Sequence, residues 1–231
     1  MKWKSFGKNL NTDYFGIISV EVLKNAQIDL MLLRADVIEP EIDLLCSTAN
    51  LNRYGFVCIP PSFTQIARNY LADTDVCVCT VISFPMGYVS NQVKLLEISD
   101  AIENGAHEIE VMLNLGNIHA NNWKSVESEI LSFKKLTDDE DIALTIIIEL
   151  DLWDDLKLKH LCQISKNTEV DFIKTSTDTL QTTINPQKIE LLAQYLDKNI
   201  GIKACGKILT RENATACIEA GAVRICSSFS L

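Results

Sequence analysis

The sequence is short of basic residues and of long apolar runs. Its 231 residues include 21 Lys and Arg against 31 Asp and Glu, which gives a formal net charge of -10. No run of Lys or Arg forms a basic segment. Nucleic acids and anionic membrane surfaces are polyanions, so this charge argues against both as partners. No apolar stretch has the length that a membrane-spanning helix needs.

Histidine is scarce, and neither histidine nor cysteine shows the spacing of a metal site. We expect His107, His119 and His160 on the surface or in loops. Cys77 and Cys79 would share one face of a strand, but no Cys or His pair at zinc spacing follows them. Most of the eight cysteines fall in apolar patterns and no apolar signal segment begins the chain. We therefore expect reduced thiols in a cytoplasmic protein that holds no metal.

Short apolar runs that alternate with amphipathic segments are abundant. The runs predict strands at 28–33, 56–59, 76–82, 108–113, 143–150, 172–175, 202–204 and 223–226. The segments between them predict helices at 39–52, 61–71, 91–104, 126–136, 156–165, 187–196 and 211–220. Eight near-continuous apolar strands separated by helices favour a parallel sheet closed into a (β/α)8 barrel, the TIM barrel, with the helices outside.

We expect the whole chain, 1–231, to form this one barrel domain. Residues 1–26 would be a lead-in, with a short helix at 17–23 that closes one end of the fold. The chain ends at Leu231, soon after the eighth predicted strand, so the final outer helix is expected to be missing.

Two lysines end predicted strands, at the side of a parallel barrel where active sites lie. Lys174 follows an apolar run and precedes three hydroxyl residues, and Lys203 repeats the pattern on the next strand. An apolar setting and a nearby cation both disfavour the ammonium form. We therefore predict that Lys203 lowers the pKa of Lys174 and leaves a nucleophilic amine that can form a Schiff base. The alternative is two ordinary strand-end lysines that reach water.

Other polar residues at strand ends are further candidates. Glu110 alternates with apolar residues and should face the barrel interior together with Glu108. A buried carboxylate is costly without a cation, so we predict that Glu110 contacts Lys174 and Lys203, with a solvated strand-end carboxylate as the alternative. Glu149 is either an interior ion-pair partner or a catalyst. The remaining candidates at strand ends are Asp29, Asn114, Thr177, Ser227 and Ser228.

Four ordered motifs resemble the deoxyribose-phosphate aldolase family: TVISFPMG at 80–87, GAHEIE at 105–110, DFIKTST at 171–177 and GIKA at 201–204. The resemblance covers about 28–228. It implies a class I aldolase without metal or organic cofactor, in which Lys174 forms the Schiff base, Lys203 lowers its pKa and Glu110 replaces the aspartate of a proton relay. The implied reaction is reversible cleavage of 2-deoxyribose 5-phosphate to acetaldehyde and glyceraldehyde 3-phosphate, in a homodimer.

The resemblance and the strand-end positions together assign substrate binding to Asp29, Thr177, Gly206, Lys207, Ser227 and Ser228. At the phosphate end the chain departs from the family. Lys207 stands where the second glycine of a pair is usual, and Asp178 brings an anion to a glycine position. Met31, Cys226 and Phe229 are further departures. Two alternatives therefore stay open: a Schiff-base aldolase for a different acceptor aldehyde, with or without a phosphate, and a non-catalytic descendant that serves as a binding module.

Overall fold

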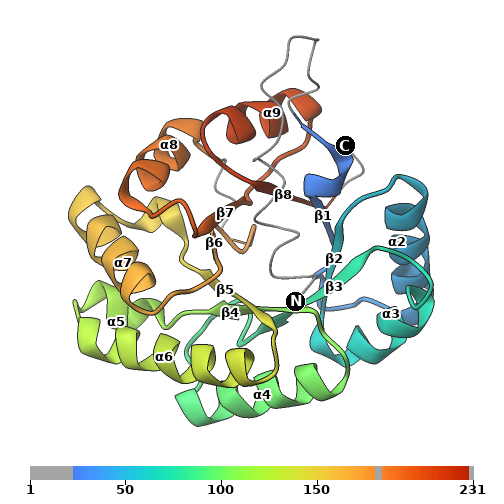
Figure 1. Cartoon of the computed structure of the whole chain (residues 1–231), viewed down its shortest axis with the longest axis horizontal. Coiled ribbons are helices and arrows are strands. Elements are labelled where there is room, and N and C mark those ends of the chain that lie inside the picture. Colours follow the sequence, from blue (N-terminus) through green and yellow to red (C-terminus); the bar gives the residue numbers. More distant parts are fainter. Residues whose placement is uncertain (1–22, 180–183, 229–231) are drawn as a thin grey trace.

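The structure is a computed structural model that describes residues 23–179 and 184–228. Its strands close into a parallel barrel in chain order, with β8 paired to β1. Figure 1 looks into this ring of strands, with the helices around it. The predicted TIM barrel is confirmed. The predicted lead-in helix, apart from Leu23, and the part of the chain after Ser228 lie outside the described residues.

All eight predicted strands are present. They are β1 Ile28–Met31, β2 Phe56–Ile59, β3 Cys77–Ile82, β4 Glu108–Met112, β5 Ala143–Ile147, β6 Phe172–Lys174, β7 Gly201–Ala204 and β8 Arg224–Ser227. Each is buried along its length, which is why the sequence shows near-continuous apolar runs. β5 ends earlier than predicted because Glu149 adopts a left-handed conformation, with φ of 49°, that an extended strand cannot contain.

The seven predicted helices are also present. They are α2 Glu39–Leu51, α3 Thr64–Tyr70, α4 Asn91–Glu103, α6 Trp123–Asp139, α7 Asp155–Asn167, α8 Pro186–Tyr195 and α9 Arg211–Glu219. Short 3-10 turns occur at η2 Asn25–Gln27, η3 Pro61–Phe63 and η4 Leu150–Leu152. The sequence does not predict α5 Leu115–His119, since five residues are too few to show a helical period. Asn114 caps α5 by accepting a hydrogen bond from the Asn117 backbone N–H at 3.2 Å.

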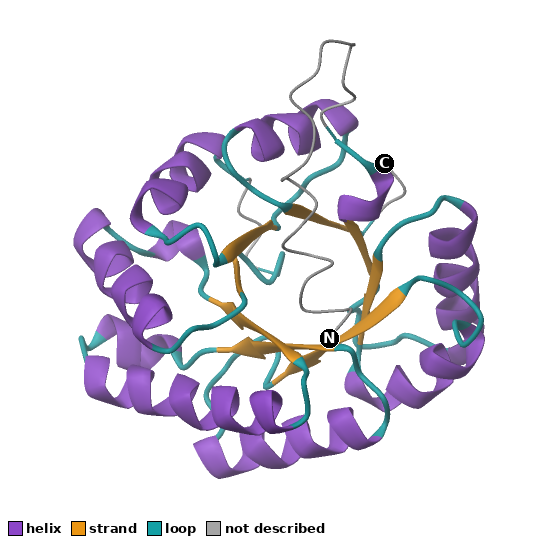
Figure 2. Cartoon of the chain, viewed as in Figure 1, coloured by secondary structure: helices purple, strands orange, loops and turns teal. Residues whose placement is uncertain are grey.

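The barrel has two distinct interiors. Between the strands and the helices lies an apolar core that includes Ile109 and Val111 of β4, in the space between the orange ring and the purple helices of Figure 2. Inside the ring lies a smaller cluster that is rich in sulfur and includes Met31 and Cys58. Alternation along β4 therefore directs Glu108 and Glu110 into the ring, as predicted.

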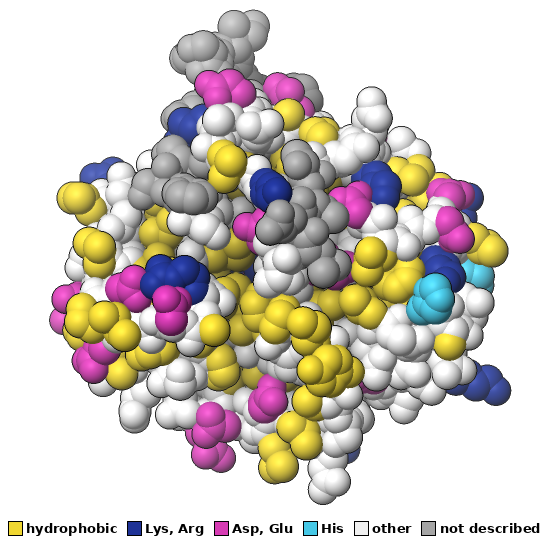
Figure 3. Space-filling model, turned by 180° about the vertical axis from the view of Figure 1, so that it is seen from behind, with side chains coloured by type: hydrophobic (Ala, Val, Ile, Leu, Met, Phe, Trp, Pro, Cys, Tyr) yellow, Lys and Arg dark blue, Asp and Glu magenta, His cyan; other side chains and the backbone are white. Residues whose placement is uncertain are grey.

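On the face shown in Figure 3, the Lys and Arg side chains of the described residues stand apart among acidic and apolar ones. Within the described residues, no helix combines the length and the apolar composition required to span a bilayer.

Candidate active site

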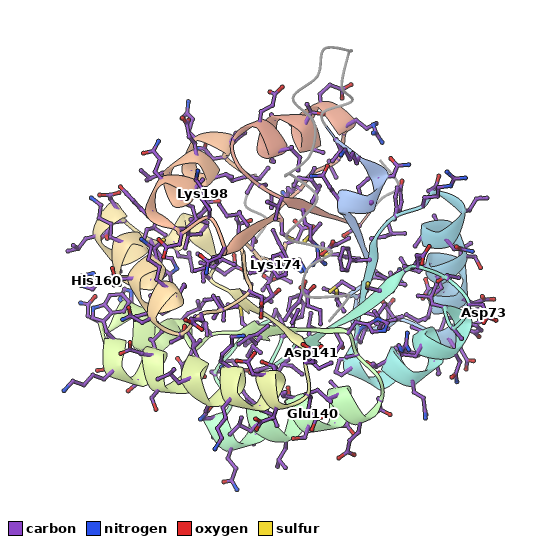
Figure 4. All side chains as sticks on the ribbon, in the orientation of Figure 1. Asp73, Glu140, Asp141, His160, Lys174 and Lys198 are labelled. Atoms are coloured by element: carbon purple, nitrogen blue, oxygen red, sulfur yellow. The ribbon has the colours of Figure 1, made fainter. Side chains whose placement is uncertain are left out.

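Three buried cations lie side by side inside the barrel. Lys174 at the end of β6 is in register with Lys203 on β7, and Lys203 is in register with Arg224 at the start of β8. All three side chains are fully buried. Figure 4 shows Lys174 within the ring of strands, whereas Lys198 and His160 lie at the outside of the molecule. The two predicted lysine strands therefore do bring their ammonium groups together.

Three buried carboxylates face these cations. Glu110 accepts a hydrogen bond from Lys174 through Oε2, at 2.7 Å, and one from Lys203 through Oε1. Glu108 accepts from Lys203 at 2.7 Å, and a carboxylate oxygen of Asp29 on β1 lies 2.7 Å from the same ammonium. The predicted contacts of Glu110 with both lysines are therefore present. The alternative of a solvated carboxylate is wrong, because Glu110 is fully buried.

Arg224 completes the cluster and is not among the predicted site residues. Its guanidinium donates to both oxygens of Asp29, at 2.8 and 2.7 Å, and to Glu108 at 2.5 Å. The ring centroids of Phe56 and Phe172 lie 3.3 and 5.1 Å from its Cζ atom, so the charge is also stabilised by aromatic faces. The signal in the sequence is an arginine within the last apolar strand, where a basic side chain needs buried partners.

The cluster balances three cations against three carboxylates, and this balance decides the pKa values. Burial is the largest single effect and disfavours the ammonium of Lys174, but the Glu110 carboxylate at 2.7 Å and the neighbouring thiols together outweigh it and hold the pKa of Lys174 well above its ordinary value. Burial and Arg224 oppose the charge of Lys203, yet its carboxylate partners also keep the pKa of Lys203 well above the ordinary value. The two lysines in turn hold the pKa of Glu110 far below its usual range, against the effect of burial.

The predicted net lowering of the Lys174 pKa is therefore wrong for this arrangement, whereas the lowering contribution of Lys203 stays a prediction. The prediction weighed one cation against the other, whereas Glu110 bridges the two ammonium groups. Lys174 is an ion-paired ammonium here, so it must give up a proton before its nitrogen can attack a carbonyl. Glu110 Oε2 is within hydrogen-bond reach of that proton, at 2.7 Å.

Sulfur atoms surround the contact between Lys174 and Glu110. Met31 Sδ lies 3.3 Å from Lys174 Nζ, and the Cys58 thiol donates to Glu110 Oε2 at 3.3 Å. Burial first and the Glu110 charge second raise the pKa of the Cys58 thiol well above its ordinary value. Cys58 is therefore a protonated donor and not a second nucleophile.

A cavity of about 890 Å³ opens at the C-terminal ends of β1, β2 and β3. Leu33 and Phe84 form part of its wall and pack against the interior cluster that contains Met31. Thr179, in the loop after β6, borders the same cavity. Lys174 does not itself line the cavity, and Met31 of this cluster is the residue that contacts it. The cavity is large enough for a small sugar or aldehyde.

Among the described residues, one group of potential metal ligands lies in the interior: Asp29, Cys79 and Glu110, whose ligand atoms lie within 4.8 Å of one another. Lys203 already contacts both carboxylates, and Arg224 contacts Asp29 and, at 3.5 Å, the Cys79 sulfur. A metal ion at this place would meet the repulsion of these two cations. The residues fit an ion-pair network and not a metal centre.

The predicted substrate-binding residues are found in several settings. Asp29 is fully buried and paired with Arg224 and Lys203, so its carboxylate serves the charge cluster. Ser227 is buried and donates to the backbone oxygen of Ile208 at 3.2 Å. Ser228 is exposed at the end of the described residues.

Glu149 holds the loop that follows β6. It accepts hydrogen bonds from Ser176 Oγ at 3.0 Å, from the Thr177 backbone N–H at 2.6 Å and from the Thr177 hydroxyl. No Lys or Arg contacts it among the described residues, so the prediction of an interior ion-pair partner is wrong. Its left-handed backbone turns the carboxylate toward the next loop. The Thr177 hydroxyl is therefore engaged within the protein.

Gly206 and Lys207 form a turn directly after β7. The Lys207 backbone N–H donates to Asp178 Oδ1 at 2.8 Å. The two departures at the phosphate end are therefore joined to each other, through the Asp178 carboxylate and the Lys207 backbone. Gly206 is buried and the Lys207 side chain is exposed.

The histidines and cysteines lie in the settings that the sequence predicts, surface or loop positions for the histidines and reduced thiols for the cysteines. His107 precedes β4 and its Nδ1 accepts a hydrogen bond from the Val78 backbone N–H at 3.0 Å. His119 ends α5, and His160 stacks on Trp123 with a centroid separation of 4.8 Å. All eight cysteines are buried free thiols, as predicted.

Comparison with known proteins links this geometry to one family. The chain is 37% identical over 204 residues to a deoxyribose-phosphate aldolase of Streptococcus equi subsp. zooepidemicus, across 88% of this chain and 92% of that protein. It is 37% identical over 202 residues to the deoxyribose-phosphate aldolase of Lactococcus lactis subsp. lactis, across 87% and 90%. No protein-family model matches the chain.

A solved structure shows the same relationship. The deoxyribose phosphate aldolase of Aeropyrum pernix superimposes with a TM-score of 0.83 and 28% sequence identity, across 88% of this chain and 86% of that one. The similarity spans the barrel from strand to strand, so it concerns the whole fold and not a single motif.

Proposed function

This chain belongs to the deoxyribose-phosphate aldolase family, and on that premise we propose that Lys174 is its Schiff-base nucleophile. The enzyme is a lyase of the aldolase type, which cleaves 2-deoxyribose 5-phosphate reversibly to acetaldehyde and glyceraldehyde 3-phosphate. The observation that carries the proposal is the single carboxylate, Glu110, that contacts both Lys174 and Lys203 inside the barrel.

The contacts of Lys174 support a sequence of proton and bond changes. A proton leaves the ammonium for Glu110, and the free amine then adds to the C1 aldehyde of the substrate. Loss of water gives a protonated imine, which acts as an electron sink. The C3 hydroxyl gives up its proton, the C2–C3 bond breaks, and its electrons form an enamine at C1 and C2. Glyceraldehyde 3-phosphate leaves, C2 regains a proton, and water releases acetaldehyde from Lys174.

Glu110 and Lys203 take different parts in this scheme. Glu110 carries protons, because one of its oxygens is 2.7 Å from Lys174 and the other accepts from Lys203. Lys203 keeps that carboxylate anionic between transfers, since its own charge is held by Asp29 and Glu108. Arg224 fixes these last two carboxylates, which leaves Lys203 able to face Glu110.

Borohydride trapping tests the role of Lys174. Incubation with acetaldehyde and borohydride should convert the imine into a stable ethyl-lysine at Lys174, located by peptide mass spectrometry. Lys174→Met should abolish this adduct, and Lys198→Met, at the outside of the molecule, should leave it intact. An active enzyme with no adduct at Lys174 would overturn the assignment.

We also propose a homodimer in the cytoplasm. Its support is family membership together with eight buried free thiols, as expected in a reducing compartment. The Aeropyrum pernix relative is described as a unique tetramer. Light scattering of the purified chain measures the number of subunits directly.

A further inference from the structure

The turn after β7 presents a backbone amide in a conformation suited to an anion. Gly206 has a φ of 128° and Lys207 a φ of 46°, so two successive residues have positive φ. A backbone N–H group that points out of such a turn can donate a hydrogen bond to a negative group. A non-glycine residue with positive φ costs free energy, so the surrounding contacts must hold Lys207 in place.

In this chain the anion at that amide is a side chain. Asp178 Oδ1 accepts the hydrogen bond of the Lys207 N–H at 2.8 Å. A carboxylate makes this a charge-assisted bond, which is stronger than a bond between neutral groups. Asp178 itself has a φ of 65°, so both partners hold left-handed backbone to make the contact.

Hydrogen bonds to Glu149 and Ser176 fix the loop that carries Asp178. Glu149 accepts from Ser176 and Thr177, and the Asp178 backbone N–H donates to Ser176 Oγ at 3.0 Å. Asp178 is therefore held toward the β7 turn by hydrogen bonds within the protein.

This contact lies at the mouth of the barrel beside the candidate site. The loops joined by Asp178 and Lys207 follow β6 and β7, whose lysines are in register. The next residue, Thr179, borders the 890 Å³ cavity. Because Lys174 ends β6, a sugar phosphate bound to it through C1 would direct its phosphate toward the loops at this end of the barrel, where Asp178 and Lys207 lie.

We propose that Asp178 is a specificity-determining residue, which competes with the phosphate of the substrate for the Lys207 backbone amide and so reduces the preference for 2-deoxyribose 5-phosphate over 2-deoxyribose. This inference rests on the proposed function. Two anions cannot share one N–H, and their charges repel at short range. A neutral sugar neither competes with Asp178 for the N–H group nor is repelled by its charge, because its C5 hydroxyl can donate a hydrogen bond to the Asp178 carboxylate.

Two substitutions distinguish the hydrogen bond that Asp178 accepts from the Lys207 N–H from the negative charge that Asp178 carries. Asp178→Gly frees the Lys207 N–H, removes the charge and suits the positive φ. Asp178→Asn removes the charge but retains an oxygen that can accept from the same N–H, and Asn tolerates this backbone conformation. Asp73→Asn is the control, because Asp73 is exposed in the loop between α3 and β3, at the outside of the molecule (Figure 4).

The first measurement is the ratio of kcat/KM for 2-deoxyribose 5-phosphate to that for 2-deoxyribose. Loss of a competing charged hydrogen bond should raise this ratio about tenfold or more in Asp178→Gly, with a smaller rise in Asp178→Asn and none in Asp73→Asn. An unchanged ratio in Asp178→Gly would overturn the inference. Equal rises in the Gly and Asn variants would also overturn it, because charge alone would then explain the effect.

The second measurement does not require catalysis. Inorganic phosphate is titrated into the ¹⁵N-labelled full-length chain, and the Lys207 amide resonance is followed. The resonance should shift at lower phosphate concentration in Asp178→Gly than in the unsubstituted chain. If phosphate does not perturb this amide in either protein, the inference fails. If the amide responds as expected but no sugar is cleaved, the proposed function fails and the anion competition stands.

Discussion

Lys174 and Glu110 meet across the barrel interior, with Nζ 2.7 Å from Oε2 and both side chains fully buried. This contact keeps the lysine charged in the resting enzyme, because the carboxylate offsets the loss of hydration that burial would impose. Reactivity at Lys174 therefore depends on how Glu110 is shared with Lys203. The two lysines are linked by this shared anion, and not merely by mutual repulsion.

Replacement of Glu110 by glutamine should shift the pH dependence of activity to lower pH. The Glu110 charge raises the pKa of Lys174, so its removal lets the ammonium lose its proton at lower pH. The limb of the kcat/KM profile on which activity rises as the Lys174 ammonium loses its proton should therefore move to lower pH. Loss of the proton carrier should at the same time lower kcat about 100-fold or more. Steady-state rates across the pH range in which Lys174 titrates check both effects.

Glu108→Gln provides the matched control for this prediction. Glu108 is buried on the same strand and contacts Lys203 and Arg224. Glu108→Gln should therefore move this limb of the kcat/KM profile much less than Glu110→Gln does. Equal shifts in the two variants would show that the total charge of the cluster, and not the contact with Lys174, sets the pH dependence.

Replacement of Lys203 by methionine should move the same limb in the opposite direction. Without Lys203, the Glu110 carboxylate would interact with Lys174 alone and stabilise its ammonium more strongly. The nearby positive charge that disfavours this ammonium would also be lost. Both changes raise the pKa of Lys174, so activity should require higher pH. Lys134→Met is the control, because Lys134 on α6 pairs with Asp138 and Asp171 outside this cluster. A limb that moves to lower pH would contradict the shared-anion account.

Much of the barrel could be predicted because its local patterns are strong. Apolar runs mark the strands, and the convergence of parallel strand ends places Lys174 beside Lys203. Alternation in β4 correctly directs Glu110 inward, where burial demands a cation. These inferences need only neighbouring residues and the geometry of a closed sheet.

The charge balance could not be predicted in the same way. Arg224 meets Asp29 across 195 positions of sequence, because closure of the barrel sets β8 beside β1. The pKa of Lys174 depends on contacts between residues that are distant in the sequence, and local sequence patterns do not predict such contacts. Glu149 is a second example, since its left-handed backbone directs it to the loop of Thr177 and not to a lysine.

His107 should make the fold less stable as pH falls from about 6.5 to about 4. Burial, and to a lesser degree Arg68, lowers the pKa of His107 from 6.5 to about 4. Between these values the unfolded chain binds more protons at this site, so the free energy of unfolding rises with pH by at most about 1.4 kcal/mol per unit, less after solvent screening. His107→Gln should remove this part of the pH dependence, as urea unfolding at both ends of the window can measure. An unaltered dependence would assign the acid sensitivity to other groups.

Replacement of Arg224 by methionine should destabilise the fold by about 3–5 kcal/mol, because Asp29 and Glu108 would lose a buried cation. Urea unfolding measures this loss. Arg34→Met is the matched control, since Arg34 also contacts two carboxylates but lies exposed at the surface. It should leave the free energy of unfolding nearly unchanged, because solvent screens such pairs.

A second substitution identifies the origin of the Arg224 effect. If the cost comes from stranded carboxylates, Arg224→Met combined with Glu108→Gln should be more stable than Arg224→Met alone, since a neutral amide replaces one unpaired charge. If the cost comes instead from lost packing against Phe56 and Phe172, the second change should add its own destabilisation. The first outcome would show that Arg224 stabilises the barrel chiefly by neutralising the two carboxylates that it shares with Lys203.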